Sequence, residues 1–373
     1  MKGSIKKRGT KWSYIVDVGF DENGKRKQKT KSGFWTKAEA QAACNELINQ
    51  INKGQYVEEK RMTLEEYLLL WLKDYAKPNM RQTSYDLREV LITKRIIPAL
   101  GKYEIQKITP HQISKFYVEL NEKGLSQEYI HSFHSLLRSA FKRAVKWQFI
   151  SKNVMENVDA PKFERRDIVT WSMDEVRKFL DNVPADQYRI AFILALYTGM
   201  RRGEILGLRW KDVDLKTGKA SIRQALTKTK MGLIFQEPKT KNAKRQIALS
   251  QEVISALKKH KHWVNKNMVQ HGPEYQNHDL VCCHEDGRPI APGTLQNVFH
   301  KRCEALELPN IRFHDLRHTH ATIMLQLGQH PKVVSKRLGH GRVGITMDIY
   351  SHVLPDMQKD AADIFESALK KGL

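Results

Sequence analysis

Two short charged segments interrupt this chain and limit what it can fold into more than any other feature of the sequence. Residues 58–61 read EEKR, and residues 159–167 read DAPKFERRD, with a proline among mixed charges. Both segments are poor in the apolar residues that a core needs, so both are candidate linkers. The chain has 373 residues, which is a prior for two or three domains. We therefore expect three domains, at residues 1–60, 61–160 and 166–373.

The first part of the chain predicts a small α+β domain. Residues 11–19 (KWSYIVDVG) favour a strand, residues 21–24 (DENG) are typical of a turn, and residues 25–31 would form a second strand. Thr36 and Glu39 form a capping box that begins a helix. A small, strongly basic sheet can enter the major groove of DNA, although an ordinary basic surface is the alternative. The residues that we expect to contact DNA here are Lys25, Arg26, Lys27 and Lys29.

The middle part predicts an all-helical domain. Apolar spacing and helix-start signals indicate four helices, at residues 64–75, 81–97, 110–123 and 127–147. In the fourth helix, an apolar stripe and a basic face follow the helical period on different sides. The basic face is suited to DNA phosphates, and plain solvation explains it equally well. The basic residues that we expect to contact DNA on this face are Arg138, Lys142 and Lys146.

The charge balance of the chain favours a polyanionic partner. Lys plus Arg number 64 and Asp plus Glu number 41, which gives a net charge of +23 and a pI near 9.7. On a folded protein, such a balance most often serves nucleic-acid binding. Apolar residues make up 40% of the chain, which argues against wholesale disorder. We expect no membrane span, no secretory signal and a reducing cytoplasm, because apolar runs are short and the four cysteines lack metal-type spacing.

The last part predicts a larger α+β domain and contains four clusters of reactive residues. Its expected strands cover residues 220–226, 232–235 and 245–249. The first cluster, YTGMRRGE, ends one helix at Thr-Gly and begins another with Arg201. Helix starts present backbone N–H groups that bind anions, so the Arg201 guanidinium would stand beside an anion site. Glu204, three residues further, can orient it; a surface Arg–Glu pair is the alternative.

The second cluster is a basic segment at residues 237–245 (EPKTKNAKR), in which four of nine residues are basic. We expect it at the tip of a hairpin. A lysine there could reach into a minor groove or protonate a leaving oxygen, and a charged turn is the alternative. The candidate lysines are Lys239, Lys241 and Lys244, and we expect Lys241 to contact DNA.

The third cluster, HDLRHTH, begins at His314. His314 and Arg317 share a helix face and offer a neutral base beside a permanent cation, which suits a phosphodiester. The alternative is a zinc site on His314 and His318, since the spacing echoes H-E-x-x-H. We expect no metal, because Asp315 is shorter than the glutamate of that motif and no third ligand is evident.

The fourth cluster, RLGH, places His340 ten residues before Tyr350. In order and spacing, the four clusters resemble the tyrosine site-specific recombinases, in particular the integrases of temperate phages and conjugative transposons. The matching stretches are TGMRRGE, PKTK, HDLRHTHAT, LGH and Tyr350. The resemblance covers nearly the whole chain. It implies a multidomain fold: a small α+β arm-site domain, an all-α core-site domain and a mixed α+β catalytic domain.

The resemblance also implies a mechanism. Tyr350 attacks the scissile phosphodiester and leaves a 3′-phosphotyrosine and a free 5′-hydroxyl. A free tyrosine has a pKa of ~10, so fixed cations must lower that pKa and stabilise the transition state. No metal and no nucleotide cofactor is implied. The remaining roles are phosphate binding by Arg201 and Arg317, a hydrogen bond to phosphate from His340, protonation of the leaving oxygen by Lys239, acid–base work on the tyrosine by His314, and orientation of Arg201 by Glu204.

By the same resemblance, the partners are double-stranded DNA with core-type and arm-type attachment sites, and further copies of the chain. The expected assembly is a tetramer on DNA at the host nucleoid in the bacterial cytoplasm, aided by DNA-bending accessory proteins. An apolar stripe at residues 364–369 would dock on a neighbouring protomer, and packing on its own domain is the alternative. The reaction would integrate or excise a mobile element. Two rivals stay open: a type IB topoisomerase-like enzyme, and a DNA-binding regulator without catalysis.

Overall fold

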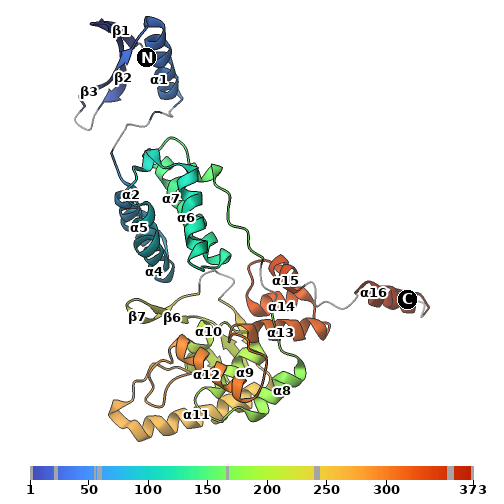
Figure 1. Cartoon of the computed structure of the whole chain (residues 1–373). Coiled ribbons are helices and arrows are strands. Elements are labelled where there is room, and N and C mark those ends of the chain that lie inside the picture. The colour runs from blue at the N-terminus through green and yellow to red at the C-terminus, as the bar shows by residue number, and fades with distance from the viewer. Residues whose placement is uncertain are drawn as a thin grey trace. The chain divides into compact units, whose positions relative to one another are not determined.

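The computed structural model describes residues 3–20, 24–53, 56, 61–164, 168–238, 244–350 and 357–370. Two compact units divide the chain, Met1–Glu164 and Arg165–Leu373 (Figure 1). Several predicted features lie outside the described residues: most of the turn at 21–24, most of the charged segment at 58–61, and both Lys239 and Lys241.

A three-stranded antiparallel sheet backed by one helix begins the first unit. Its strands are β1 (Gly3–Arg8), β2 (Lys11–Phe20) and β3 (Arg26–Phe34), in the order β1-β2-β3, and its helix is α1 (Lys37–Asn52). Tyr14 and Val16 alternate onto the buried face of β2, where they pack with Cys44 and Leu47 of α1. The predicted capping box of Thr36 and Glu39 begins α1 as expected.

The rest of the first unit is helical. Its helical segments are α2 (Leu64–Trp71), η1 (Leu72–Ala76), α3 (Lys77–Asn79), α4 (Gln82–Leu91), η2 (Ile92–Ile96), α5 (Ile97–Leu100), α6 (Pro110–Glu122) and α7 (Gln127–Lys146), with short 3₁₀ turns at Ile105–Lys107 and Val154–Asn157. A continuous apolar core joins them, and the Tyr67 hydroxyl donates to the Ala140 carbonyl at 2.6 Å, which ties α2 to α7.

The first two helices of this region continue further than predicted. We expected them to end at Tyr75 and Ile97, ahead of Pro78 and Pro98, but they run on to Asn79 and Leu100. A π-helical turn precedes each proline, η1 before Pro78 and η2 before Pro98. The wider i→i−5 turn moves aside the carbonyl with which a proline ring would clash, so the helix can continue.

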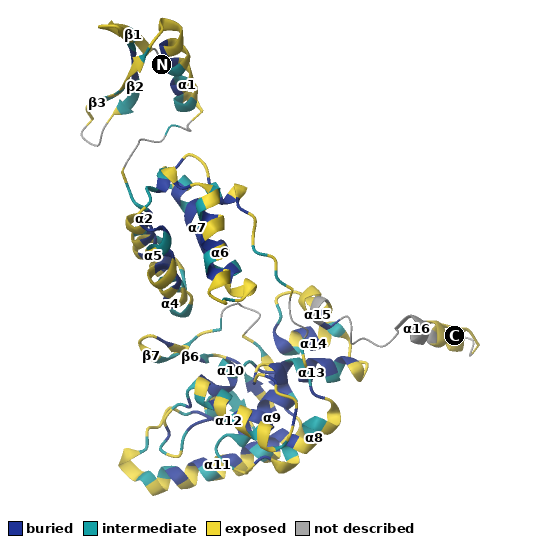
Figure 2. Cartoon of the chain, viewed as in Figure 1, coloured by how far each residue is buried: buried dark blue, intermediate teal, exposed yellow. Residues whose placement is uncertain are grey.

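The second unit is built around α9 (Arg189–Thr198), whose residues are almost all buried (Figure 2). Its Phe192 packs in an aromatic cluster with Trp171, Phe179 and Phe299. The other helices of this unit are α8 (Met173–Asn182), α10 (Arg202–Leu206), α11 (Gln251–His271), α12 (Pro292–Ala305), α13 (Asp315–Gln326), α14 (Pro331–Leu338), α15 (Val343–Tyr350) and α16 (Met357–Lys370), with 3₁₀ turns at Trp210–Asp212 and Gly272–Glu274.

The strands of the second unit depart from the prediction. The expected strand at 220–226 is split between β5 (Lys219–Ser221) and β6 (Ala225–Thr229). The first of these joins β4 (Val213–Asp214) and β8 (Gln246–Ala248) in one sheet, whereas β6 pairs with β7 (Gly232–Gln236) in a separate hairpin.

The basic segment at 237–245 lies between β7 and β8, which belong to different sheets, and its residues 239–243 lie outside the described part of the chain. The segment follows β7 and precedes β8. Strand β8 pairs antiparallel with β5, and Ile247 lies opposite Ala220 in that pair. The tip of the actual hairpin lies between Thr229 and Gly232. Within the described part of the chain, no helix is long and apolar enough to cross a membrane.

Candidate active site

Arg201 stands at the start of α10, where the chain turns sharply out of α9. Gly199 makes this turn possible with a φ of 65°, because a Cβ there would lie 2.7 Å from His320 and 2.6 Å from Leu338. Glu204 then closes the first turn of α10. Its carboxylate accepts from the Arg201 backbone N–H at 3.0 Å and from Arg201 Nη1 at 2.9 Å. The predicted orientation of Arg201 by Glu204 therefore has a direct contact in the structure.

Arg317, on α13, is held by the backbone at both ends of this turn. Its side chain is 3% exposed, and it donates from Nη1 to the Gly199 carbonyl at 2.7 Å and from Nη2 to the Leu338 carbonyl at 2.8 Å. Burial, reinforced by the charge of Arg201, lowers the pKa of Arg317 to about 9, so it stays a cation at neutral pH. Arg201 Nη2 faces the next carbonyl, that of Gly339, at 3.4 Å. The two guanidiniums thus contact two successive carbonyls at the end of α14, those of Leu338 and Gly339.

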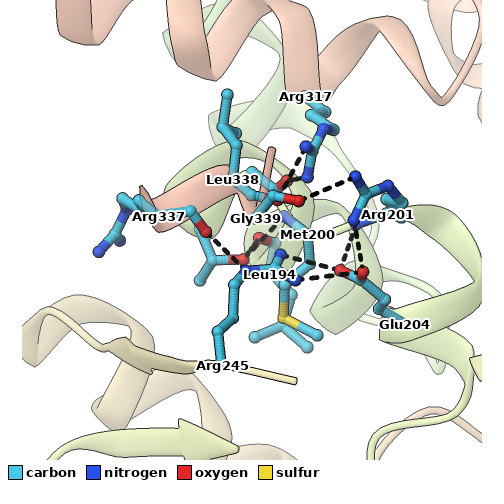
Figure 3. A network of polar contacts seen from close by, with 11 residues as sticks. Leu194, Met200, Arg201, Glu204, Arg245, Arg317, Arg337, Leu338 and Gly339 are labelled. Atoms are coloured by element: carbon cyan, nitrogen blue, oxygen red, sulfur yellow. Dashed lines mark hydrogen bonds and ion pairs between the residues drawn. The ribbon is translucent and has the colours of Figure 1, made fainter. Parts of the chain in front are cut away.

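A third guanidinium, which the sequence did not reveal, completes this buried network (Figure 3). Arg245 donates from Nη2 and Nη1 to the two oxygens of Glu204 at 2.9 and 3.2 Å, and from Nε to the Arg337 carbonyl at 2.7 Å. Burial alone would raise the pKa of Glu204, but the hydrogen bonds and charges of Arg245 and Arg201 outweigh it and lower that pKa. Arg245 ends the basic segment that was singled out for its lysines.

Tyr350 lies at the end of α15 and is only 2% exposed. Burial raises the pKa of its hydroxyl to about 12, although Arg317 acts in the opposite direction. The hydroxyl lies 2.6 Å from Nδ1 of His318, on α13. His314, the predicted acid–base partner, caps the start of α13, and its ring meets the ring of His318 edge-on with centroids 5.4 Å apart.

His340 follows the glycine that ends α14. Gly339 takes the left-handed conformation with a φ of 71°, and a Cβ there would lie 3.0 Å from Nη1 of Arg245. The His340 ring reaches the Thr346 hydroxyl at 2.8 Å. Burial and the nearby Arg317 and Arg201 lower the pKa of His340 to about 4, so it is neutral at physiological pH and keeps one N–H to donate.

Arg337 and His320 form a second pair that the sequence did not predict, and this pair joins α14 to α13. Nε of Arg337 donates to His320 Nε2 at 3.2 Å, and the other ring nitrogen of His320 donates to the Leu196 carbonyl at 2.7 Å. Arg337 also donates to the carbonyls of Tyr197 and Ala248. These side-chain hydrogen bonds therefore fix α14 to α13, to the end of α9 and to β8.

The predicted lysine cannot be located, because Lys239 and Lys241 lie outside the described residues. Their neighbour Lys244 is described, and its ammonium contacts Glu237 at 2.7 Å. Among the described residues, no group of three His, Cys, Asp or Glu side chains could hold a metal ion.

The predicted DNA-contact residues of the first unit are on its surface. On α7, Arg138, Lys142 and Lys146 are all exposed on one face. At the start of β3, Lys25 and Arg26 are exposed, and Arg26 pairs with Asp17 at 2.6 Å. Lys27 and Lys29 are partly covered, and the Lys29 ammonium lies 5.8 Å from the ring centre of Tyr56.

Comparisons with known proteins agree with this arrangement. Residues 171–357 match the phage integrase family, residues 4–51 match an arm DNA-binding domain, and residues 63–121 match the N-terminal SAM-like domain of phage integrases. The chain is 27% identical to the ICEBs1 integrase of Bacillus subtilis over 95% of this chain and 97% of that protein. It is 29% identical to a XerC-like tyrosine recombinase of Caldanaerobacter subterraneus over 93% of this chain and 94% of that protein.

Solved structures share the fold. The Tn1549 transposon integrase in complex with a circular intermediate DNA aligns with a TM-score of 0.68 and 21% identity, over 82% of this chain and all of that one. A lambda integrase tetramer bound to a Holliday junction aligns with a TM-score of 0.59 and 19% identity, over 94% and 95% of the two chains. The chain belongs to the phage integrase family of tyrosine recombinases, enzymes that cleave and exchange DNA strands. The resemblance and the fold class predicted from the sequence are both confirmed.

Proposed function

We propose that this chain integrates and excises a mobile element by cutting one DNA strand at a time with Tyr350. The observation that carries the proposal is that Arg317 and Arg201 donate to two successive carbonyls at the end of α14, those of Leu338 and Gly339. The two cations thus converge at the end of α14, and Tyr350 lies on the next helix, α15. A phosphodiester bound between them would have its developing negative charge stabilised without reorganisation of the protein.

In the proposed reaction, the phenolic oxygen of Tyr350 attacks the scissile phosphorus. The 3′-phosphotyrosine bond forms as the bond to the 5′ oxygen breaks, and Lys239 gives that oxygen its proton. Arg201 and Arg317 hold the non-bridging oxygens, and His340 donates a hydrogen bond to one of them. For the proton of Tyr350, the family resemblance points to His314, whereas the 2.6 Å contact points to His318.

We infer that the chain has three working parts, at residues 1–60, 61–160 and 166–373. The first would bind arm-type DNA through its basic strand, and the second would bind core-type DNA through the exposed face of α7. The net charge of +23 supports both assignments, since neutralised phosphates supply most non-specific affinity for DNA. The match of residues 4–51 to an arm DNA-binding domain supports the first. The proposed place of action is the nucleoid of a bacterial host, with DNA-bending proteins as helpers.

We further propose that four copies act together on DNA. The related lambda integrase was solved as a tetramer on a Holliday junction, which is the assembly expected for paired strand exchanges. On α16, Phe365 and Leu369 are 67% and 68% exposed at a spacing of four residues. Two large apolar side chains on one exposed helix face suit docking on a neighbouring copy.

A trapped adduct tests the proposal. A pool of duplexes, each nicked just beyond the cleavage position, loses the short 5′-hydroxyl fragment after cleavage and leaves the protein covalently bound. We expect the wild-type chain to yield adducts whose sequences reveal the attachment site, and we expect none from Tyr350→Phe, the matched variant that lacks only the hydroxyl. Adducts from the phenylalanine variant, or none from either protein, would contradict the proposal.

The topoisomerase alternative shares the cleavage chemistry and needs a second measurement. Two labelled duplexes that carry the recovered site should exchange strands in the presence of the protein. A protein that relaxes supercoiled DNA but never joins one duplex to the other would be a topoisomerase.

A further inference from the structure

The hydroxyl of Tyr350 has a specific partner that the family resemblance does not assign. Its oxygen lies 2.6 Å from Nδ1 of His318, and the two ring centres are 5.7 Å apart. Tyr350 is buried, and His318 is partly buried on the neighbouring helix α13. The contact joins the reacting atom itself to an imidazole.

The proton in this bond lies on the tyrosine. Because burial raises the pKa of Tyr350 to about 12, the phenol is protonated at neutral pH and donates. His318 is then neutral, with Nδ1 as the acceptor and its proton on Nε2. Burial lowers the pKa of His318, Arg317 and Arg312 lower it further, and Asp315 raises it. His314 also faces the His318 ring. His318 in turn lies close enough to His340 to lower the pKa of His340.

His314 contacts the ring of His318, whereas His318 contacts the Tyr350 hydroxyl itself. It is exposed at the start of α13, and its ring packs edge-on against His318 at 5.4 Å between centroids. His318 thus contacts His314 on one side and the nucleophile on the other. A general base must lie within hydrogen-bond reach of the proton it removes, and His318 meets that condition.

We propose that His318 is a catalytic residue, the base that takes the proton of Tyr350 as the phenolic oxygen attacks the scissile phosphorus. The inference rests on the proposed function of Tyr350. As the bond from phosphorus to the phenolic oxygen forms, the bond to the 5′ oxygen breaks and the phenolic proton moves to Nδ1 of His318. The 5′ oxygen takes a proton from Lys239. In the rejoining step the incoming 5′-hydroxyl loses a proton to Lys239, and Nδ1 returns its own to the released tyrosine.

The test uses single-turnover cleavage of the nicked duplex by the full chain. In His318→Asn the amide oxygen can stand where Nδ1 stands, so the hydrogen bond to Tyr350 is kept while the base is lost. We expect His318→Asn and His318→Ala each to slow adduct formation by about 100-fold or more, since a positioned base contributes ~10²–10⁴-fold. Added imidazole should restore part of the rate in His318→Ala, where it can enter the vacated space.

A substrate with sulfur in place of the 5′ leaving oxygen separates the two proton transfers. A thiolate leaves without protonation, so this substrate should rescue a defective acid but not a defective base. We expect no rescue of His318→Asn. DNA binding and the melting temperature of each variant check that it is folded.

Three results would overturn the proposal. Near wild-type cleavage by His318→Asn would make His318 a positioning residue, and rescue of that variant by the sulfur substrate would make His318 an acid. A greater loss of cleavage rate in His314→Asn than in His318→Asn would also contradict it. If the wild-type chain forms no adduct at all, the proposed function fails instead, so the two failures are distinguishable.

Discussion

The cations of the candidate active site and those on α7 carry the same charge in opposite settings. Arg245 and Arg317 are buried, and they donate to Glu204 and to backbone carbonyls at 2.7–3.2 Å. Arg138, Lys142 and Lys146 are exposed on a helix face. A fixed cation can stabilise a transition state because nothing has to move, whereas an exposed one can only attract DNA and follow its backbone. On the proposed function, the exposed cations of α7 account for DNA binding, and the buried cations of the candidate active site account for DNA cleavage.

Replacing Arg317 should have the largest effect on the rate of DNA cleavage. In Arg317→Ala, the phosphate loses a cation and the carbonyls of Gly199 and Leu338 lose their donors. We expect cleavage of the nicked duplex to fall by about 10²–10³-fold or more, because one preorganised donor is worth that much. The measurement is the single-turnover rate at saturating protein. An unchanged rate would mean that Arg317 serves the fold alone.

Arg245 should matter first for stability. Arg245→Met leaves the buried Glu204 carboxylate with one partner instead of two, and breaking a buried ion pair from one side costs about 3–5 kcal/mol in the free energy of unfolding. Urea denaturation measures the change. The double variant Arg245→Met with Glu204→Gln should recover part of the loss, and strict additivity of the two single changes would show that the pair is not coupled.

The pH dependence of stability should carry the signature of Glu204. Its pKa is lowered in the folded chain, so its contribution is present above the unfolded value of about 4.3 and is lost as pH falls through the folded pKa. We expect wild-type stability to fall more steeply than that of Glu204→Gln between about pH 5 and pH 3. Parallel curves for the two proteins from urea denaturation at each pH would contradict this assignment.

The exposed face of α7 should give the smallest effect on chemistry and a clear effect on binding. Replacing Arg138, Lys142 and Lys146 by Ala should lower the log–log salt slope of DNA affinity by up to about 0.9 for each phosphate that the protein no longer neutralises. Stability should change by no more than about 0.5 kcal/mol for each substitution. Cleavage at saturating protein should stay close to wild type. A matched substitution on the same helix away from this face, Arg143→Ala, tests whether the slope belongs to the face.

The sequence revealed those parts of the molecule that rest on local signals. A capping box placed the start of α1, and motif spacing located Arg201, Arg317, His340 and Tyr350 on one unit. It could not reveal contacts between distant segments. Arg245 meets Glu204 across 41 residues, and His318 meets Tyr350 across 32, so neither pair leaves a periodic trace. The ends of the first two helices of the middle part were predicted too early, because a π turn is a backbone adjustment that composition does not encode.

The buried network draws on stretches that emerge from the ribosome at different times. Arg201 and Glu204 come first, then Arg245, then Arg317, and Tyr350 comes last. A chain interrupted before residue 350 would carry the basic surfaces described above and still lack Tyr350, the nucleophile that we propose. On the proposed mechanism, incomplete synthesis would therefore yield proteins that bind DNA without cutting it, because the nucleophile is translated only after all of these cations.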